Sequence, residues 1–557
     1  MACTTNIKTL SYGDQKPGTS GLRKKVAIFQ QAHYSENFIQ SIFDTVGQSI
    51  QSNTIVVGGD GRYWEPEVAR LLIKMAAANK VKKVVVGQNG IMSTPAVSHY
   101  IIKHGAIGGI VLTASHNPGG PLNDFGIKYN GENGGPAPSS VTDRIYTTSK
   151  NLTNYNICHD LDIDISVVSS HQVDVDGNSF TVEVIDPVKD YASYMEEIFD
   201  FPQLRGYIKK TNLQVLVSAL NGVMGPYVKE ILCQRLGVPE SSAIACEPLP
   251  DFGGLHPDPN LTYAASLVEA MKDGIYDIGA AFDGDGDRNM ILGKNAFFVS
   301  PSDSLAVLAD HLDCIPYFKK TGIKGFARSM PTAAAVDRVA VAKGLRVFEV
   351  PTGWKYFGNL MDAGEISLCG EESFGTGSDH IREKDGMWAL LAWLSVMAHT
   401  GKTVEQLLTD HWSKYGRNFF TRYDYEECDA NNASEMMSYL RSLVDSGSLI
   451  GKELLATSGE SYTVQLMDDF SYTDPIDKSV TTKQGIRVIF TDGSRIIFRL
   501  SGTGSSGATV RLYIDSYESD AKKCGQSAEM LAPLINVALT LSRLKEFTGR
   551  DTPTVIT

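Results

Sequence analysis

The sequence lacks closely spaced cysteines: its eight cysteines are scattered over 557 residues, with no CxxC pair and no clustered histidines. This spacing excludes the common zinc motifs and a dense disulfide framework. Long apolar runs are also missing, because no window approaches the ~18 uninterrupted apolar residues of a membrane span and the N-terminus has no signal-like apolar segment. We therefore expect reduced thiols, a cytoplasmic location and no membrane span.

Basic residues are in the minority, with 51 Lys and Arg against 64 Asp and Glu and a formal net charge of −13. Such a charge repels nucleic acid and anionic membranes, so neither is an expected partner. An anionic small substrate would need a locally basic pocket. The composition is that of a globular protein, and the length predicts about three to five domains of ~100–200 residues.

Short β-rich apolar runs alternate with helical stretches in three rounds, which begin near residues 54, 213 and 303. This alternation predicts βαβ units and largely parallel or mixed sheets. Three similar rounds of roughly a hundred residues favour three related α/β domains. The last part differs, since "IRVIFTDGSRIIFRL" predicts a hairpin around Asp492 and Gly493 and hence an α+β domain. The polar segment 160–179 is expected to be an insertion or a linker.

The segment "DGDGDR" carries Asp283, Asp285 and Asp287 at a spacing of two. If it continues the preceding strand, all three carboxylates point to one side, and the glycines let the backbone bend around one centre. Hard oxygen ligands of this kind suit Mg²⁺. An EF-hand loop is excluded, because the positions that need Gly and Glu hold Arg288 and Lys294. An acidic surface turn is the alternative, although three like charges this close repel one another without a cation.

The segment "RLSGTGSSGATVR" places Arg499 and Arg511 on either side of small residues. Free backbone N–H groups, hydroxyls and guanidinium groups together can form a phosphate cradle. The members between the arginines are Ser501, Gly502, Thr503 and Gly504. A Walker A loop is excluded because its Gly-Lys-Ser/Thr is missing. A flexible turn between two strands is the alternative.

Two other loops contain residues that suit catalysis or binding, but an ordinary turn or helix cap would explain the same residues. "TASHNPGG" contains Ser115 and His116, but Ser and Asn before Pro often only shape a turn. "GEESFG" contains Glu371 and Ser373, whose carboxylate and hydroxyl suit recognition of sugar hydroxyls. A capped helix start explains this second loop equally well.

These four elements occur in the order, and one to a domain, in which the α-D-phosphohexomutase superfamily carries its phosphoserine, metal, sugar and phosphate loops. Longer blocks such as "FGIKYNGENGGPAP" and "PTGWKYFGNLMDAG" resemble the eukaryotic phosphoglucomutases over nearly the whole chain. The resemblance implies an α/β, heart-shaped molecule of four domains around a central cleft, namely three related α/β mixed-sheet domains and a C-terminal α+β domain. The expected limits are 1–187, 188–300, 301–404 and 405–557.

The resemblance also implies an activity, the reversible interconversion of glucose 1-phosphate and glucose 6-phosphate. It would proceed through a phosphoserine at Ser115 and a glucose 1,6-bisphosphate intermediate, which also acts as activator. One Mg²⁺ per chain would be held by the three aspartates and a phosphate oxygen on Ser115. Small sugar phosphates are the implied partners, and the implied state is a monomer or weak dimer.

The resemblance assigns roles residue by residue. The implied catalytic residues are Ser115, His116, Arg23, Lys128, Arg288 and Lys384. The implied substrate-binding residues are Thr352, Gly353, Glu371, Ser373, Arg499, Ser501, Gly502, Thr503, Gly504 and Arg511.

Two alternatives remain open at this point. Some relatives of phosphoglucomutase are non-catalytic scaffold proteins, in which we would expect damage to the serine or metal loop; both loops are intact here. Phosphomannomutase activity is the second alternative. The "GEESFGTGSDH" block resembles the glucose-specific branch, but secondary activity on mannose 1-phosphate stays possible.

Overall fold

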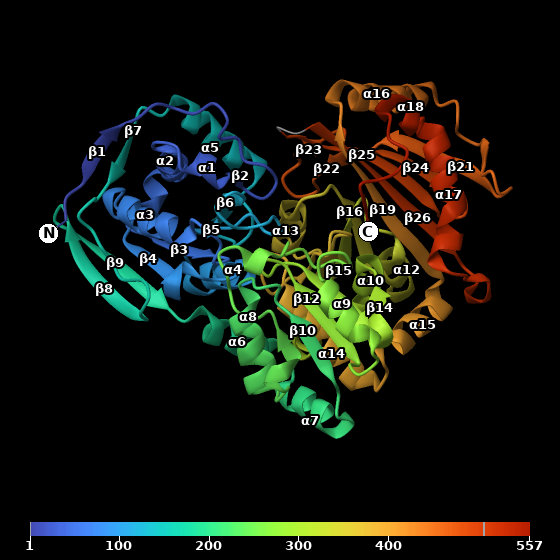
Figure 1. Cartoon of the computed structure of the whole chain (residues 1–557), viewed down its shortest axis with the longest axis horizontal. Helices are drawn as coiled ribbons and strands as arrows, with labels where there is room; N and C mark the ends of the chain where they lie inside the picture. Colours follow the sequence, from blue (N-terminus) through green and yellow to red (C-terminus); the bar gives the residue numbers. More distant parts are fainter. Residues whose placement is uncertain (1, 505–506) are drawn as a thin grey trace.

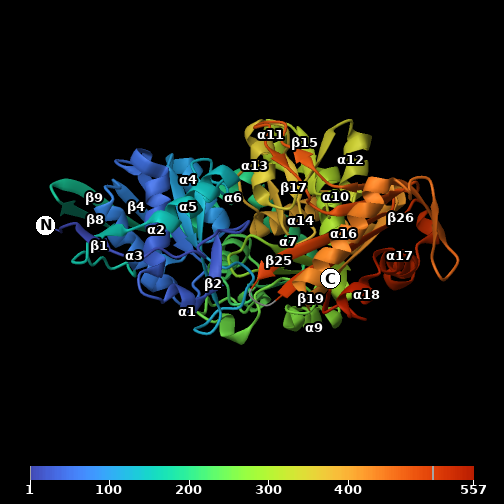
Figure 2. The same cartoon turned by 90° about the horizontal axis from the view of Figure 1, so that it is seen from above.

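The computed structural model describes residues 2–504 and 507–557, and for 502–504 it describes the backbone only. Figure 1 shows two lobes that meet at their lower ends, a blue N-terminal lobe and an orange-red C-terminal lobe, in a heart-like outline. The framework consists of four larger sheets. Each sheet is the centre of one domain, and we number these domains I to IV in chain order. Figure 2 shows domain I on one side and domains III and IV on the other.

Domain I is built on a mixed sheet whose central strands are apolar and rich in β-branched residues. In spatial order these are β2 (Leu22–Lys25), β6 (Asp124–Gly131), β5 (Gly108–Leu112), β3 (Thr54–Gly59), β4 (Lys83–Gly87), β9 (Asn178–Ile185) and β8 (Ser169–Val175). Its helices include α2 (Tyr34–Val46), α3 (Glu65–Ala78), α4 (Thr94–His104) and α5 (Ser139–Asn151). Along β3, Ile55 and Val57 pack in one core and Val56 in another, so alternation in the strand serves both faces.

The segment 160–179 is predicted to be an insertion or a linker, and this prediction is wrong for its second half, whereas residues 161–168 have no helix or strand. Strand β8 pairs antiparallel with β9 from Ser169 to Val175 and forms the edge of the domain I sheet. The side chains of β8 alternate between exposed and half-buried positions, so the strand is polar on the side that faces solvent. An edge strand of this kind has few apolar residues, which explains why its sequence looked irregular.

Domains II and III repeat the pattern with smaller sheets. The strands of domain II are β11 (Ala243–Ile244), β10 (Val215–Ser218), β12 (Ile278–Phe282), β13 (Asn289–Gly293) and β14 (Phe297–Val299). Those of domain III are β16 (Arg346–Val350), β15 (Gly325–Ser329), β17 (Leu368–Gly370) and β18 (Thr376–Ser378). Their longer helices are α6 (Pro187–Ile198), α7 (Phe201–Thr211), α9 (Ala265–Lys272), α10 (Pro301–His311), α12 (Ala335–Lys343), α13 (Trp354–Asp362), α14 (Gly386–Thr400) and α15 (Val404–Tyr415).

Helix α14 shows how domains I to III are joined. Its residues from Gly386 to Met397 are buried, and an apolar surface on all sides belongs to a helix inside a core. Trp388 and Trp393 lie in a cluster that also contains Val97 of domain I and Val217 of domain II. Helix α15 begins at Val404, where the limit between domains III and IV is expected, and packs against α10 and α12 of domain III. None of the described helices is both long and apolar enough to cross a membrane.

One topological feature is common to the three domains. In each sheet a central parallel strand is followed by an antiparallel neighbour, as β5 by β6, β12 by β13 and β17 by β18. The connecting loops carry Ser115, the three aspartates and Glu371 respectively. The same place in each domain therefore supplies one of the predicted functional loops, and the predicted four-domain α/β architecture is confirmed.

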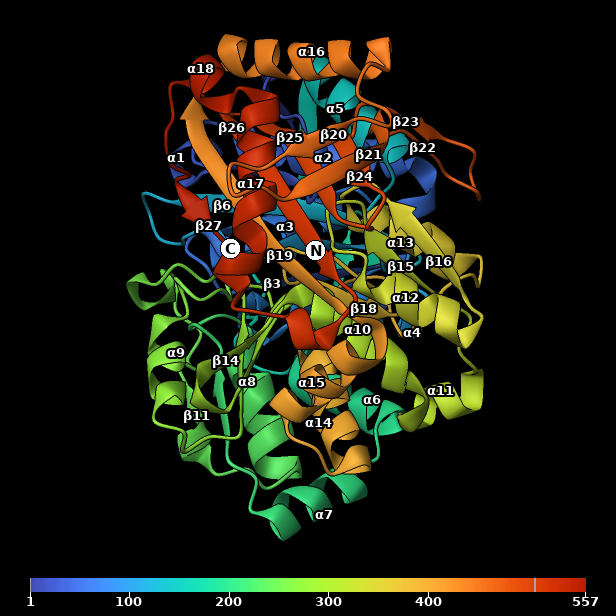
Figure 3. The ribbon, with the colours of Figure 1, turned by 90° about the vertical axis from the view of Figure 1, so that its right-hand side faces the viewer.

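Domain IV is antiparallel, as the sequence predicts. Its strands in spatial order are β20 (Glu453–Leu455), β21 (Ser461–Asp469), β24 (Ile486–Phe490), β25 (Arg495–Gly504), β26 (Gly507–Glu518), β19 (Arg417–Cys428) and β27 (Val555–Ile556). Strands β24 and β25 form the predicted hairpin, with φ of 89° at Gly493. Figure 3 shows α16 (Ala430–Ser446) and α17 (Ser527–Ser542) lying over this sheet.

A cluster of opposite charges fastens domain IV to domain III. Glu349 of β16 accepts hydrogen bonds from Arg328 at 3.0 Å, from Arg495 at 3.0 Å and from Arg487 at 2.6 Å. Burial alone would raise the pKa of Glu349, but the three guanidinium groups outweigh it and lower the pKa to about 2. The carboxylate is therefore the common partner of charges from two domains.

Removing this charge should loosen the junction. We expect Glu349→Gln to lower the free energy of unfolding by about 3 kcal/mol, because three arginines lose their shared partner. Since folding lowers the pKa of Glu349 from its ordinary 4.5, this stabilisation is complete above pH 4.5 and is lost as the pH falls toward 2. Urea unfolding of wild type and variant at pH 7 and pH 3 measures both effects.

The matched control is Glu365→Gln, which breaks a more exposed pair with Arg346. Exposed pairs contribute about 0–1 kcal/mol, so this variant should unfold close to wild type. Equal midpoints for Glu349→Gln and Glu365→Gln would contradict the role given to Glu349.

Candidate active site

Loops from all four domains line one cleft of about 330 Å³. The predicted residues found in its lining are Arg23, His116, Lys128, Arg288, Thr352, Gly353, Glu371, Ser373, Lys384, Ser501 and Arg511. Ser115 and the three aspartates lie next to this lining and are almost completely buried. The cleft is locally rich in basic groups, as an anionic ligand of an acidic protein requires.

Ser115 lies on the loop between β5 and β6 and is 2% exposed. Its Oγ donates a hydrogen bond to Oδ2 of Asp283 at 3.0 Å and lies 3.4 Å from Nδ1 of His116. The backbone of Ser115 has φ of 54°, a left-handed conformation that strains a residue with a Cβ atom. Contacts around the loop must therefore hold it in place.

A buried network that the sequence analysis missed supplies those contacts. Arg62 donates to the carbonyl of Ser115 at 2.8 Å and pairs with Asp60, and both charged side chains are 0% exposed. Thr113 Oγ1 donates to Asp60 at 2.6 Å and accepts from the Ser115 N–H at 2.7 Å. The only sequence feature was an Asp-Gly-Arg after an apolar run, which is too short to indicate a role.

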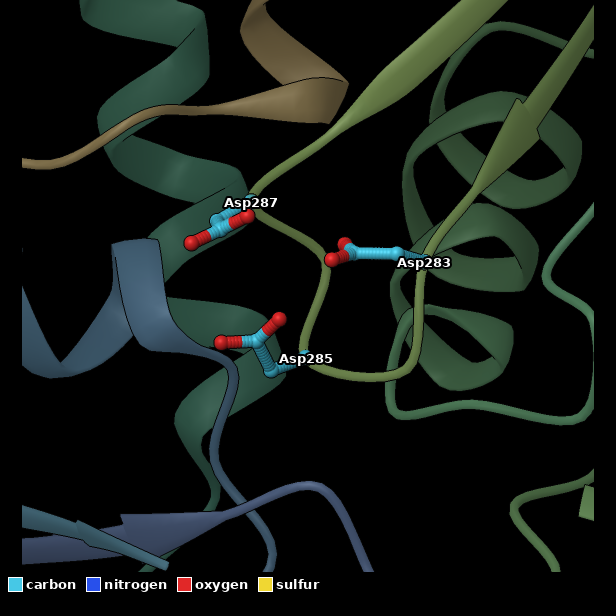
Figure 4. A group of neighbouring side chains, drawn as sticks. All are labelled: Asp283, Asp285 and Asp287. Atoms are coloured by element: carbon cyan, nitrogen blue, oxygen red, sulfur yellow. The ribbon is translucent and has the colours of Figure 1, made fainter. Parts of the chain in front are cut away.

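Asp283, Asp285 and Asp287 lie on the loop between β12 and β13 and point toward one another (Figure 4). One oxygen of each lies within 4.8 Å of the others. Strand β12 ends at Phe282, so the carboxylates converge because the loop turns, with φ of 78° at Gly286, and not because a strand continues. Buried Oδ1 atoms of Asp285 and Asp287 have no hydrogen-bond partner among the described residues. This donor set fits a hard divalent cation.

The charge state of the triplet supports the same conclusion. Burial, followed by the charges of Asp285 and Asp287, raises the pKa of Asp283 well above its ordinary range. Thr94 Oγ1 donates to Asp285 at 2.6 Å and offsets part of that repulsion. Three buried carboxylates this close remain ionised together only when a cation joins them.

Two of the predicted basic residues contact the triplet directly. Lys384 Nζ lies 3.2 Å from Asp287, and Arg288 lies 3.9 Å from Asp283 and 3.7 Å from Asp258. Burial alone would lower the pKa of Lys384, but the charge of Asp287 outweighs it and raises that pKa. Lys384 therefore carries a positive charge at neutral pH.

The other two basic residues come from domain I. Lys128 forms a buried ion pair with Glu383, which also accepts from Asn130 at 2.8 Å. Arg23 has a buried Nε with no hydrogen-bond partner among the described residues, and burial lowers its pKa. A desolvated guanidinium in this position favours a bound anion.

His116 differs from these groups because it is neutral. Burial, followed by the charges of Arg288 and Arg23, lowers the pKa of His116 well below its ordinary value. A neutral imidazole 3.4 Å from the Ser115 Oγ has one ring nitrogen with a free lone pair, but the lowered pKa makes it a weaker base than an ordinary histidine.

The sugar-loop candidates meet at the opening of α13. The carboxylate of Glu371 accepts from the Gly353 N–H at 3.2 Å. Gly353 has φ of 134°, a conformation that favours glycine. Thr352 Oγ1 is buried without a hydrogen-bond partner among the described residues, and Ser373 faces the same cleft. These polar groups are available to ligand hydroxyls.

The predicted phosphate loop is the end of the β25–β26 hairpin. Ser501 and Arg511 line the cleft, whereas Arg499 is not in its lining and donates to Gln484 O at 3.1 Å and to Tyr513 OH at 3.3 Å. Of Gly502, Thr503 and Gly504 only the backbone is described, so the predicted role of the Thr503 hydroxyl lies outside the described part of the chain.

The cleft also contains residues that sequence reasoning missed. They are Asp258, Asn260, Glu383, Arg422 and Thr557. Their neighbours in space lie far away in the sequence, and single charged or polar residues in loops gave no pattern that could have indicated them.

Family comparison covers nearly the whole chain. Residues 14–156, 189–296 and 300–415 match the alpha/beta/alpha domains I, II and III of phosphoglucomutase/phosphomannomutase, and 417–554 match the C-terminal domain of Phosphoglucomutase-1. With the cleft described above, these matches define a sugar-phosphate mutase of the phosphohexomutase class. The chain belongs to the phosphoglucomutase/phosphomannomutase family, and the resemblance inferred from the sequence is confirmed.

Individual relatives match this chain over its full length or nearly so. The chain is 60% identical to Phosphoglucomutase 1 of Drosophila melanogaster and 59% identical to Phosphoglucomutase-1 of Homo sapiens, with 100% of both chains covered in each case. It is 51% identical to Phosphoglucomutase-like protein 5 of Homo sapiens, over 99% of this chain and 98% of that one. The crystal structure of pp63/parafusin, a phosphoglucomutase from Paramecium in an open form, matches with a TM-score of 0.92 and 46% identity over 100% of both chains.

The donor set can be tested by direct metal binding. We expect Asp287→Asn to weaken Mg²⁺ binding by at least about tenfold, because one anionic ligand of a hard cation becomes neutral. Calorimetric titration of the purified protein measures the affinity. Asp273→Asn removes the same charge from an exposed site in domain II and should leave the affinity unchanged. Equal losses in both variants would show that overall charge, not coordination, controls binding.

Proposed function

We propose that the protein interconverts glucose 1-phosphate and glucose 6-phosphate, with Ser115 as the phosphoryl carrier. The observation that carries this proposal is that Ser115 Oγ lies 3.0 Å from Asp283, a member of the acidic triplet. Both residues lie beside a cleft that all four domains line. Phosphoryl transfer needs little more than positioning and neutralisation of charge, and this centre offers both. Full-length identity to phosphoglucomutases supports the same activity.

In the proposed cycle, the phosphorylated Ser115 gives its phosphoryl group to O6 of glucose 1-phosphate. The Oγ–P bond breaks as the O6–P bond forms; the O6 proton passes to a base, for which neutral His116 is a candidate, and the freed Ser115 Oγ takes up a proton. Glucose 1,6-bisphosphate then turns over in the cleft. The O1–P bond breaks as a new Oγ–P bond forms, Ser115 Oγ gives up its proton and O1 gains one, which leaves glucose 6-phosphate and restores the phosphorylated Ser115. Free glucose 1,6-bisphosphate would phosphorylate Ser115 at the start and so act as activator.

The three aspartates and a phosphate oxygen on Ser115 would hold one Mg²⁺, which supplies positive charge beside the transferring group. Arg23, Lys128, Arg288 and Lys384 add positive charge from domains I, II and III. Lys384 and Arg288 are each tied to an aspartate of the triplet, so their charges are fixed in place before a ligand binds. Preorganised charge of this kind lowers the barrier without rearrangement during the reaction.

The phosphate that is not being transferred must be bound in either orientation of the sugar. We assign it to Ser501, Arg511 and the backbone of 502–504, with Arg422 nearby and with Arg499 as a neighbour outside the cleft lining. Glu371 and Ser373 would bind the hydroxyls at positions 3 and 4, with Thr352 and Gly353 beside them. A site that recognises phosphate and ring hydroxyls separately can accept both isomers.

The proposal has two further parts. A cytoplasmic location agrees with the eight free thiols of the structure, since reducing compartments keep cysteines in this form. A monomer or weak dimer is the expected state, which sedimentation at micromolar concentration measures.

The central test is the Ser115→Ala variant. With Mg²⁺ and a trace of glucose 1,6-bisphosphate, we expect wild type to convert glucose 1-phosphate and the variant to lose at least about 10⁴-fold in kcat, because the carrier of the phosphoryl group is gone. Ser193→Ala, an exposed serine on α6, is the matched control and should keep wild-type activity. Mannose 1-phosphate is the comparison substrate. Equal, negligible rates from all three folded proteins would refute the enzymatic proposal and favour a scaffold role.

A second test concerns the phosphate site. We expect Arg511→Gln to raise KM for both sugar phosphates by about 10–100-fold, because a hydrogen bond to a charged group contributes roughly 1.5–3 kcal/mol. The loss should be similar in the two directions of the reaction, since the same site serves both orientations. Arg346→Gln removes an exposed arginine and should change neither KM. A loss confined to one substrate would contradict the shared site.

A further inference from the structure

A second cavity, of about 470 Å³, lies between domains II, III and IV. Figure 3 shows the elements around it, with β14 and α15 below and β27 and α17 above. Its apolar walls are formed by Phe297, Phe298, Trp412, Phe419, Leu531 and Ile556. Cavities of roughly 300–1,000 Å³ with aromatic walls are the usual size and chemistry of small-ligand sites, and junctions between domains are a common place for them.

Arg417 gives this cavity a specific polarity. Its guanidinium stacks on Trp412, at 3.8 Å from the ring centre, and on Phe419, at 4.2 Å. Nη2 donates to Ser527 Oγ at 3.2 Å, and the buried Nε has no hydrogen-bond partner among the described residues. Burial lowers the pKa of Arg417, and the charge of Asp303 offsets part of that effect. The two rings hold the guanidinium in a fixed orientation at the cavity wall.

The other charged side chain of the cavity, Asp303, interacts with Arg417 through space, but the two form no ion pair among the described residues. Asp303 accepts hydrogen bonds from Ser300 at 3.0 Å and from Trp412 Nε1 at 3.1 Å, which occupy both of its carboxylate oxygens. A buried carboxylate in the same wall also disfavours ligands with two negative charges. The cavity therefore suits one negative charge at Arg417 and an apolar body elsewhere.

We propose that this cavity binds a small organic anion with a single carboxylate and an apolar body, such as an aromatic or medium-chain carboxylic acid. The carboxylate would pair with the Arg417 guanidinium, and the apolar body would lie against the phenylalanine and leucine side chains. Sugar phosphates are excluded from this class because they are polar over their whole surface and carry more than one negative charge.

The cavity is separated from the cleft by a thin wall. Asn260, Phe374 and Thr557 line both spaces. Phe374 follows Ser373 directly and has φ of 67°, so a displaced ring moves the loop that carries the proposed sugar contacts. Resting on the proposed function, we therefore expect an occupied cavity to change KM for sugar phosphate more than kcat, because the Ser115 centre is not part of the shared wall.

The probe for the binding test is 1-anilinonaphthalene-8-sulfonate, an aromatic monoanion whose fluorescence rises in apolar sites. N-phenyl-1-naphthylamine is its uncharged counterpart. We expect saturable binding of the anion to the full-length protein, and a loss of about 10–100-fold in Arg417→Gln, since one charged hydrogen bond contributes roughly 1.5–3 kcal/mol. The uncharged probe should bind wild type and Arg417→Gln with similar affinity. Arg543→Gln is the matched control, because Arg543 also stacks on two rings but lies at the surface.

A second variant answers the question if Arg417→Gln fails to fold. Leu531→Trp keeps Arg417 but fills the cavity, and it should weaken both probes. Failure of the anion to bind wild type, unchanged affinity in both variants, or complete displacement of the anion by saturating glucose 6-phosphate would overturn the proposal. Partial displacement that reaches a plateau supports two coupled sites.

The effect on turnover is measured separately. KM for glucose 1-phosphate, with and without the anionic probe, should change in wild type and stay constant in Arg417→Gln. A constant KM in wild type, with binding intact, would overturn the coupling alone. If the protein shows no mutase activity at all, the proposed function fails while the binding result stands.

Discussion

Repulsion among three buried carboxylates is the constraint on which the active centre depends. Asp283, Asp285 and Asp287 are held within 4.8 Å of one another, and only positive charge can keep them ionised there. Part of that charge comes from the chain itself, since Arg288 follows the triplet and Lys384 reaches it from domain III, and a bound cation would supply the rest. The centre is therefore complete only when domains I to III are packed together, which is what the core around α14 achieves. The packing of domains I to III and the charge balance around the three aspartates therefore depend on each other.

The position of Ser115 follows from the same principle. Its strained backbone is stabilised by a network in which Asp60 and Arg62 neutralise each other out of contact with water. A buried pair of this kind adds little net stability, but it fixes geometry because every polar atom needs its partner. Domain IV is fastened differently, by Glu349 and three arginines in addition to a shared apolar cluster. Its charged and partly accessible junction contrasts with the apolar core that unites the first three domains.

Much of the fold could be predicted from the sequence, because strands and helices with apolar periodicity are local features. The same holds for Asp283, Asp285 and Asp287, whose spacing is itself the signal. Arg62 and Glu383 could not be found this way, since their partners lie 53 to 255 residues away and become neighbours only in space. Strand β8 was mistaken for a linker because an edge strand is largely polar. Arg499 was predicted in the phosphate site from its place beside the loop and from the family resemblance; its side chain bonds within domain IV and lies outside the cleft lining.

The repeated hairpin of domains I to III has an evolutionary consequence. Strands β5, β12 and β17 occupy equivalent places, yet the loops that follow them carry Ser115, the three aspartates and Glu371, for which we propose three different roles. Copies of one ancestral unit could each keep the scaffold and change only the loop. One of the three loops can therefore change its residues while the strand framework and the other two loops stay the same.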